Sequence, residues 1–457
     1  MAREIRMNAF QMNCVVHQSP GLWRHPRDRS PDYNTLAYWT DIARILERGK
    51  FDGLFLADVL GVYDVYGHSA AAALRQAAQI PVGDPLLLIP AMAMVTEHLG
   101  FGVTFNLSYE PPFPFARRMS TLDHLTRGRI GWNIVTGYLN SAAQSVGRDQ
   151  QNAHDDRYDV ADEYMQVVGK LWEESWEDGA AVRDRARGVF TDPAKVHRVR
   201  HRGPHYTLDG IHLSEPSPHR TPVLYQAGSS PRGRIFAARH AECVFISGPS
   251  QQVIGPRVAA LREEVRRAGR DPARVLVFAL ATVIVAPTEA AAQAKAAEYR
   301  AYASVEGALT LMSGWTGVDF STYALDQQVR HVENDAGRTA MDNITRADPA
   351  RVWTVREVAE HVAIGGIGPV IVGDPRQVAD ALESWVDETG IDGFNLASAV
   401  VPESFADFVD LVVPELQRRG RYKRDYAPGT LRQKLFGPAY EGPRRARPGP
   451  LDVTTPG

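Results

Sequence analysis

Cysteine is scarce in this sequence: Cys14 and Cys243 are the only two thiols among 457 residues. Two cysteines cannot form a disulfide framework or a thiolate metal cluster. Long apolar runs are also missing. None reaches the roughly 18 residues of a membrane-spanning helix, and the start MAREIRMNAF lacks the apolar core of a signal peptide. We therefore expect a cytoplasmic protein that does not bind a membrane.

A charge excess is absent too. The formal net charge of -3 gives no reason to expect nucleic acid as a partner. With 44% hydrophobic and 23% charged residues, the composition is typical of a soluble globular protein with a large core. The length alone does not decide the number of domains, because α/β barrels routinely exceed the average domain size.

Common nucleotide and metal motifs do not occur. The chain has neither GxGxxG nor a Gly-Lys-Ser/Thr phosphate loop. Its 14 histidines leave a metal-dependent barrel hydrolase open as an alternative, yet no HxH or HExxH pair is present. We expect no metal site and interpret His197, His201 and His205 as solvated loop residues.

Eight apolar segments predict buried strands, and helical periodicity separates most of them. The segment FDGLFLADVL is apolar almost throughout, which is typical of a parallel strand buried on both faces. This alternation predicts an α/β fold, a (β/α)₈ TIM barrel whose strand carboxyl ends build the active site. The predicted strands are residues 4–10, 51–58, 101–107, 129–135, 222–226, 243–247, 275–285 and 392–398.

Two stretches exceed the usual connection between barrel strands. An irregular, basic stretch over residues 176–218 follows the fourth strand, and HYTL and IHL within it resemble short strands. The gap between the seventh and eighth predicted strands includes the glycine-rich IGGIGPVIVGDP, and we predict an inserted lid or subdomain over about residues 286–370. We expect one barrel domain over residues 1–436 and an extended Pro/Gly/Arg-rich tail over residues 437–457.

Polar residues stand where several predicted strands end. Asp58 ends the second strand, Thr104 lies in the third, and Asn133 and Thr136 lie in and after the fourth. Taken alone, Asp58 is more typical of a helix cap or loop residue facing water. A barrel would bring all of these side chains, together with Ser229, to one face, and this convergence favours a functional site.

A phosphate site is predicted beside two helix starts. His154 and Tyr158 flank a helix that begins near Asp155, and the turn containing Ser229 and Ser230 precedes a helix that starts with proline. Free N–H groups at a helix N-terminus favour anions. A serine-rich helix cap without a ligand remains an equal alternative for the turn. His17 follows the first strand and could contact substrate or a proton, or simply pack under its loop.

Several long segments of the chain are similar to a known family. LERGKFDGLFLADVLGVYD, ARRMSTLDHLTRGRIGWNIVTGYLNSAA, AHDDRYDVADEYM and HRTPVLYQAGSSPRG resemble the bacterial-luciferase-like FMN-dependent monooxygenases. More narrowly, they resemble the branch that contains nitrilotriacetate, dibenzothiophene-sulfone and dimethyl-sulfide monooxygenases. The similarity extends over residues 8–436.

This resemblance implies a luciferase-type barrel and an FMN site. Asp58, Thr104, His154, Tyr158 and Ser229 match the family's flavin site residue by residue. It also implies that a separate NAD(P)H:flavin reductase supplies the flavin as FMNH₂, and that O₂ and a small-molecule substrate are the other reactants. A homo-oligomer, either dimer or tetramer, is expected.

The implied activity is the oxidation of a small organosulfur compound with cleavage of a C–S bond. Ser230 would then contact the phosphate, Asn133 and Thr136 would lie near the flavin, and His17 would orient the substrate. The same flavin chemistry on an amine, a chelator or a natural-product intermediate is an alternative. A deazaflavin-dependent dehydrogenase and a flavin-binding scaffold without activity are further alternatives.

Overall fold

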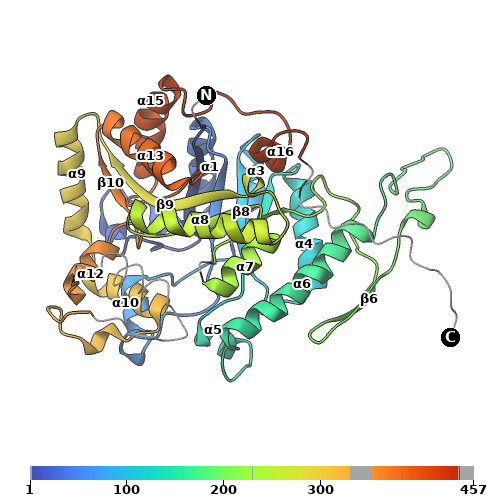
Figure 1. Cartoon of the computed structure of the whole chain (residues 1–457), viewed down its shortest axis with the longest axis horizontal. Coiled ribbons are helices and arrows are strands. Elements are labelled where there is room, and N and C mark those ends of the chain that lie inside the picture. The colour runs from blue at the N-terminus through green and yellow to red at the C-terminus, as the bar shows by residue number, and fades with distance from the viewer. Residues whose placement is uncertain (1–2, 229, 330–351, 441, 443–457) are drawn as a thin grey trace.

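Eight parallel strands form a closed barrel at the centre of the molecule (Figure 1). The computed structural model describes residues 3–228, 230–329, 352–440 and 442. The barrel closes because β9 pairs with β8 on one side and with β11 on the other. The predicted TIM barrel is confirmed, with each expected strand present. The barrel strands are β1 (Arg6–Met12), β2 (Gly53–Ala57), β3 (Gly100–Asn106), β4 (Ile130–Val135), β7 (Val223–Gln226), β8 (Cys243–Ile246), β9 (Leu276–Val285) and β11 (Gly393–Ala397).

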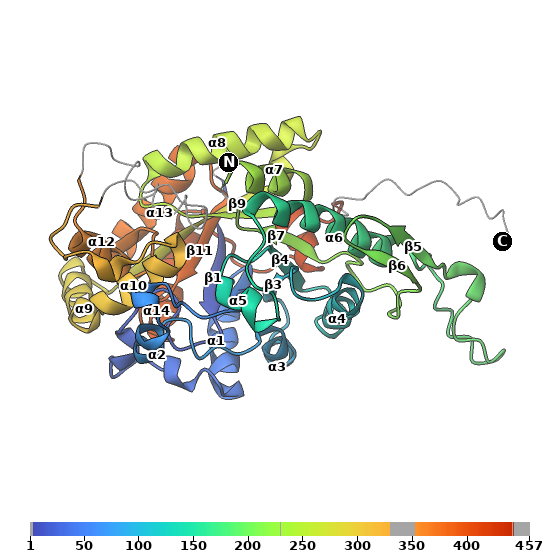
Figure 2. The same cartoon turned by 90° about the horizontal axis from the view of Figure 1, so that it is seen from below.

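Helices cover the outside of the barrel (Figures 1 and 2). In α1, Trp39, Ile42 and Leu46 are buried at three- and four-residue spacing, so one face of the helix packs on the strands. The side chain of Thr35 caps this helix. The surrounding helices include α1 (Leu36–Arg48), α2 (Ala71–Gln76), α3 (Ile89–Met94), α4 (Pro112–Leu125), α6 (His154–Glu174), α7 (Pro231–His240), α8 (Gln251–Arg267), α13 (Pro375–Thr389), α14 (Glu403–Asp407) and α15 (Val413–Arg418).

The insertion after β4 contains α5 (Asn140–Ser145), α6 and a two-stranded hairpin. The hairpin is formed by β5 (Val199–Arg202) and β6 (Thr207–Gly210), which pair antiparallel. The strand expected at HYTL overlaps β6. The strand expected at residues 211–213 is wrong, because the extended pairing ends at Gly210. Both views show this hairpin projecting from the barrel on the side opposite α9, α10 and α12 (Figures 1 and 2).

The segment after β9 contains α9 (Glu289–Tyr302), α10 (Val305–Thr316) and α12 (Val355–Val362). It ends in a strand that the sequence did not predict, β10 (Val370–Gly373), which pairs with the second half of β9. The strand is short and follows a glycine-rich stretch, so that its apolar signal is weak. Part of the predicted lid, residues 330–351, lies outside the described residues, as does most of the predicted tail.

Aromatic side chains fill the inside of the barrel. The Phe10 ring lies 5.6 Å from Phe55 and 5.0 Å from Phe245, and Phe55 lies 5.6 Å from Tyr225, measured between ring centroids. Four different strands or strand ends contribute these rings. The barrel is therefore a packed core, and a ligand can enter only above the aromatic layer.

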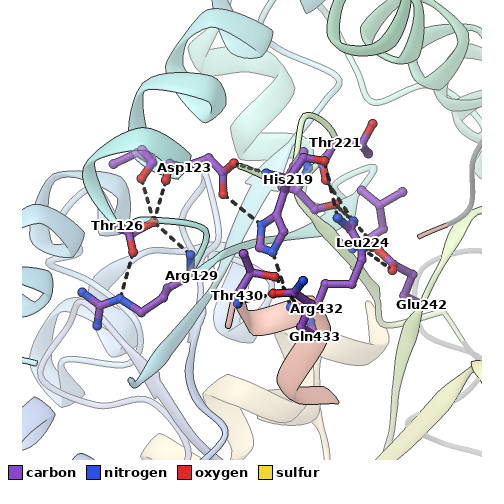
Figure 3. Close-up of polar contacts among 12 residues, drawn as sticks. Asp123, Thr126, Arg129, His219, Thr221, Leu224, Glu242, Thr430, Arg432 and Gln433 are labelled. Atoms are coloured by element: carbon purple, nitrogen blue, oxygen red, sulfur yellow. Dashed lines mark hydrogen bonds and ion pairs between the residues drawn. The ribbon is translucent and has the colours of Figure 1, made fainter. Parts of the chain in front are cut away.

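Buried ion pairs seal the end of the barrel where the strands begin, which we call the amino end (Figure 3). Helix α16 (Leu431–Phe436) packs there, and its Arg432 forms two hydrogen bonds of 2.8 and 2.9 Å with the carboxylate of Glu242. His219 lies between Arg432 and Asp123, with its Nδ1 atom 2.9 Å from an Asp123 oxygen. Within the described parts of the chain, no helix is both long enough and apolar enough to cross a membrane.

Candidate functional site

Two polar side chains meet above the aromatic layer, at the carboxyl end of the barrel. Thr104 and Asn133 are partners in the β3–β4 register and are each 3% exposed. The amide Nδ2 of Asn133 donates to Thr104 Oγ1 over 2.8 Å. The other amide atom, Asn133 Oδ1, is buried and has no hydrogen-bond partner among the described residues. A buried acceptor without a donor is costly, so this oxygen suits a ligand N–H or O–H group.

Tyr158 on the first turn of α6 forms one wall of a cradle at the start of α7. Its hydroxyl lies where a side chain on Gly233 would collide, since a Cβ atom there would be 2.7 Å away. A Cβ atom on Gly228 would be 3.0 Å from the same hydroxyl. Burial raises the pKa of Tyr158, while Arg157 and a hydrogen bond with Ser230 oppose this shift. Both glycines are buried, and because they lack a side chain the Tyr158 hydroxyl can pack directly against the backbone at the start of α7.

The two predicted serines differ in what the structure describes. Ser230 is the N-cap of α7, and its hydroxyl accepts a hydrogen bond of 3.0 Å from the backbone N–H of Gly233. Ser229 lies outside the described residues. His154 is the first residue of α6, and its ring centroid lies 5.3 Å from that of Tyr158. The structure therefore brings His154, Tyr158 and Ser230 together, as the sequence predicted.

Asp58 lies directly after β2, at the same end of the barrel. Burial raises the pKa of Asp58 to about 7, and the nearby Asp84 carboxylate adds to this shift, while the Val59 backbone N–H opposes it. No described cation pairs with this carboxyl group. Asp58 is therefore poised between its neutral and its ionised form near pH 7, unlike an ordinary surface cap.

His17 stands over the aromatic layer and is 8% exposed. Its ring meets Phe10 edge-on with centroids 4.4 Å apart, and its Nε2 atom lies 3.2 Å from Gln18 Nε2. Burial lowers the pKa of His17 to about 3, although a hydrogen bond with the Phe10 backbone opposes the shift. The imidazole is neutral at physiological pH and can orient a substrate through a hydrogen bond, but it does not carry a proton as a cation.

A hydrogen-bonded cluster beside His17 was not predicted. The Tyr63 hydroxyl bonds with Gln79 over 2.9 Å and with the Tyr138 hydroxyl over 2.5 Å, and Trp315 Nε1 donates to it over 3.1 Å. Gln79 Nε2 also donates to the His17 carbonyl oxygen over 3.0 Å. The cluster fastens α10 to the loops that follow β2 and β4. Its members are far apart in the sequence, and no local motif marks them.

Thr136 is less closely tied to the site than the sequence suggested. It follows β4 directly, and its carbonyl oxygen accepts a hydrogen bond from Ser108 over 2.8 Å. Its hydroxyl bonds with none of the described residues.

One of the histidines after α6 is more buried than expected. The side chain of His201 is 7% exposed and lies 2.9 Å from Glu163, so the interpretation as a solvated loop residue is wrong for His201. The described residues contain no group of three or more His, Cys, Asp or Glu side chains suited to hold a metal ion.

Comparisons with known proteins agree with this architecture. The family described as luciferase-like monooxygenase matches residues 12–393. The chain is 54% identical over 437 residues to the dimethyl-sulfide monooxygenase of Hyphomicrobium sulfonivorans, covering 96% of this chain and 91% of that protein. It is 49% identical over 437 residues to the long-chain alkane monooxygenase of Geobacillus thermodenitrificans, covering 96% and 95%.

A solved structure supports the same relationship. The crystal structure of riboflavin lyase with modified FMN and substrate riboflavin superposes with a TM-score of 0.89 at 36% identity, over 97% of this chain and 98% of that one. The match to the family model extends over most of the barrel, and the sequence relatives cover nearly the whole chain. This chain belongs to the luciferase-like monooxygenase family.

Proposed function

We propose that the protein is the oxygenase component of a two-component, FMN-dependent monooxygenase that cleaves a C–S bond in a small organosulfur compound. The observation that carries the proposal is the pairing of two features at one end of the barrel. One is the buried Thr104–Asn133 pair with its free acceptor, and the other is the glycine-lined cradle of Tyr158 and Ser230.

These features fit FMN in both its parts. A flavin ring offers N–H groups, and Asn133 Oδ1 is a buried acceptor that lacks a donor among the described residues. The phosphate of FMN suits the start of α7, where Ser230 caps the helix and the Tyr158 hydroxyl covers the glycine backbone. We propose that Asp58, Thr104, Asn133, Thr136, His154, Tyr158, Ser229 and Ser230 bind the cofactor.

Reduced FMN, when bound, supplies two electrons and activates O₂, so that one oxygen atom reaches the substrate and the other leaves as water. The protein itself must position the substrate and exclude water from the site. Neutral His17 can hold the substrate by a hydrogen bond, and the Tyr63 cluster holds α10 over the same end of the barrel. The reductant would come from a separate NAD(P)H:flavin reductase.

The substrate class follows from the relatives and from the site. Oxygen insertion at the carbon next to sulfur gives a hemithioacetal, which separates into a thiol and an aldehyde. The relative at 54% identity is named for dimethyl sulfide, which is small and apolar enough to lie on the Phe10 layer. The relative at 49% identity is named for long-chain alkanes, so alkane hydroxylation is the second candidate.

The test is a sealed-vial assay with FMN, NADH, an unrelated flavin reductase, air and dimethyl sulfide. We expect methanethiol and formaldehyde in equal amounts, both dependent on enzyme, on reductase and on air. Parallel vials contain linear alkanes and tertiary amines. Alkanol or dealkylated amine without methanethiol would contradict C–S cleavage and keep the oxygenase chemistry. Product formed in the strict absence of air would contradict the monooxygenase proposal.

A further inference from the structure

One buried arginine at the carboxyl end of the barrel has no partner. Among the described residues, four arginines are buried: Arg129, Arg157, Arg421 and Arg432. Arg157 lies on the first turn of α6, next to Tyr158, and is 7% exposed. Its guanidinium makes no hydrogen bond or ion pair with any described residue, and its Nε atom is fully buried without an acceptor.

The other three buried arginines lie at the amino end of the barrel, and each of their guanidinium groups has hydrogen-bond acceptors within the chain. Arg432 binds Glu242 through two hydrogen bonds, as Figure 3 shows. Arg421 donates to Asp387 over 2.8 Å. Arg129 has no carboxylate, yet it donates to Thr96 Oγ1 and to carbonyl oxygens that include Leu99 and Ala93. Of these four buried arginines, Arg157 is the one whose guanidinium donates no hydrogen bond to a described residue.

The surroundings of Arg157 lead toward the cofactor cradle. Burial lowers the pKa of Arg157, and the hydroxyls of Tyr158 and Tyr109 oppose this shift. Tyr158 lies over the glycines at the start of α7, and Tyr109 is held by Gln151 over 2.6 Å. Both neighbours are neutral hydroxyls, and no described carboxylate pairs with the guanidinium. A buried guanidinium without an anion costs several kcal/mol, and a planar fork of N–H donors matches a phosphate.

We propose that Arg157 is the charged residue that binds the phosphate of FMN and makes the site select FMN over riboflavin. This inference rests on the proposed function and adds a residue and a selectivity to it. The phosphate provides the anion for Arg157, which pairs with no carboxylate among the described residues. In the free protein the guanidinium has no anion beside it among the described residues and its Nε atom is buried, so the proposal also implies that Arg157 lowers the stability of the flavin-free form.

The test compares Arg157→Met and Arg157→Lys with the wild type and with Arg200→Met, which changes an exposed arginine whose side chain is 78% exposed. The affinities of oxidised FMN and riboflavin are measured by fluorescence titration. We expect Arg157→Met to weaken FMN binding by about 10- to 100-fold and to leave riboflavin binding unchanged. The FMN affinity of Arg157→Lys should lie between those of the wild type and Arg157→Met, because lysine keeps the positive charge and lacks the planar pair of N–H donors. Arg200→Met should match the wild type.

Two results would overturn the inference while the flavin proposal stands. One is unchanged FMN affinity in Arg157→Met, and the other is an equal loss of FMN and riboflavin affinity, which indicates a role in shaping the site. Failure of the wild type to bind FMN would instead overturn the proposed cofactor. In that case thermal unfolding in inorganic phosphate decides on the anion site. If inorganic phosphate raises the unfolding temperature of the wild type but not of Arg157→Met, the anion site at Arg157 is supported. If phosphate affects both proteins equally, Arg157 is not part of an anion site.

Discussion

Two aspartates at the two ends of strand β2 have opposite pKa shifts, because one is paired with cations and the other is not. Asp52 precedes the strand and is 5% exposed, and its carboxylate lies 2.9 Å from Lys423 and 3.3 Å from Arg6. Burial alone would raise the pKa of Asp52, but Lys423 and Arg6 lower it below its ordinary value. Asp58 follows the strand without a cation, and burial raises its pKa to about 7.

The contrast extends to the whole molecule. At the amino end, the buried charged groups discussed above have an ion-pair or hydrogen-bond partner, as with Arg432 and Glu242 in Figure 3. At the carboxyl end, Asn133 Oδ1, Thr282 Oγ1 and Arg157 Nε are buried without a partner among the described residues. Unpaired buried polar groups lower stability and are retained where a ligand completes them. The amino end thus contributes stability, and the carboxyl end is where we propose that the ligand binds.

The largest expected effect is at the amino end. Asp52→Asn removes a buried anion that lies between the partly buried Arg6 and Lys423, so we expect a loss of about 3 to 5 kcal/mol of unfolding free energy at pH 7. Urea unfolding followed by circular dichroism measures it. Because the lowered pKa places the stabilising charge above about pH 3.8, the loss should shrink as the wild type is acidified through the pKa of Asp52. If Asp52→Asn loses less than about 1 kcal/mol of unfolding free energy at pH 7, the ion pairs at the amino end do not contribute the stability that we expect.

Asp58→Asn should raise the unfolding free energy at neutral and higher pH, which is opposite to the effect of Asp52→Asn. Because the pKa of Asp58 is raised from 3.8 to about 7, the folded wild type binds a proton more tightly than the unfolded chain, and its stability falls as the pH rises between these values. Asparagine stays neutral. We expect the variant to exceed the wild type by about 2 to 4 kcal/mol at pH 8 and to match it near pH 4.

Unfolding curves at both pH values, with Asp52→Asn as the reference of opposite sign, give this comparison. A stability difference between Asp58→Asn and the wild type that does not change with pH would contradict the raised pKa of Asp58.

The sequence predicted the barrel and part of the site because both depend on strands. A strand buried on both faces is apolar throughout, and parallel strands place their carboxyl ends together, so Asp58, Thr104 and Asn133 could be found from position alone. The proposed cofactor, FMN, came from the resemblance of long segments to a known family. Strand β10 was missed because it is short and follows a glycine-rich stretch.

Other parts of the site depend on contacts that no local pattern contains. Tyr63 meets Tyr138 across 75 residues and Trp315 across 252 residues, so only the folded chain brings them together. The absence of a partner for Arg157 is equally invisible in sequence, where acidic residues surround it along α6. Similarly, Asp58 resembles an ordinary cap until burial and the neighbouring Asp84 are known.

A smaller effect is expected from removing one hydroxyl at the carboxyl end. Tyr158→Phe removes the group that covers the glycines at the start of α7, and we expect FMN binding to weaken by about 1 to 3 kcal/mol. Tyr206→Phe, on the β5–β6 connection, is the matched control and should keep wild-type affinity. Flavin titration measures both. Equal affinities in the two variants would remove Tyr158 from the phosphate site.

The smallest effect separates stability from binding at a single residue. Ser230 caps α7 by accepting from Gly233 N–H, and the same hydroxyl belongs to the proposed phosphate cradle. Alanine at an N-cap costs about 1 kcal/mol of stability, whereas glycine costs only a few tenths. We expect Ser230→Ala to lose both stability and FMN affinity, and Ser230→Gly to keep most of the stability and still lose about 1 kcal/mol of affinity. Thermal unfolding and flavin titration on both variants give the two quantities. If the affinity of Ser230→Gly equals that of the wild type, the hydroxyl serves the helix alone, and the phosphate is held by the backbone and by other side chains.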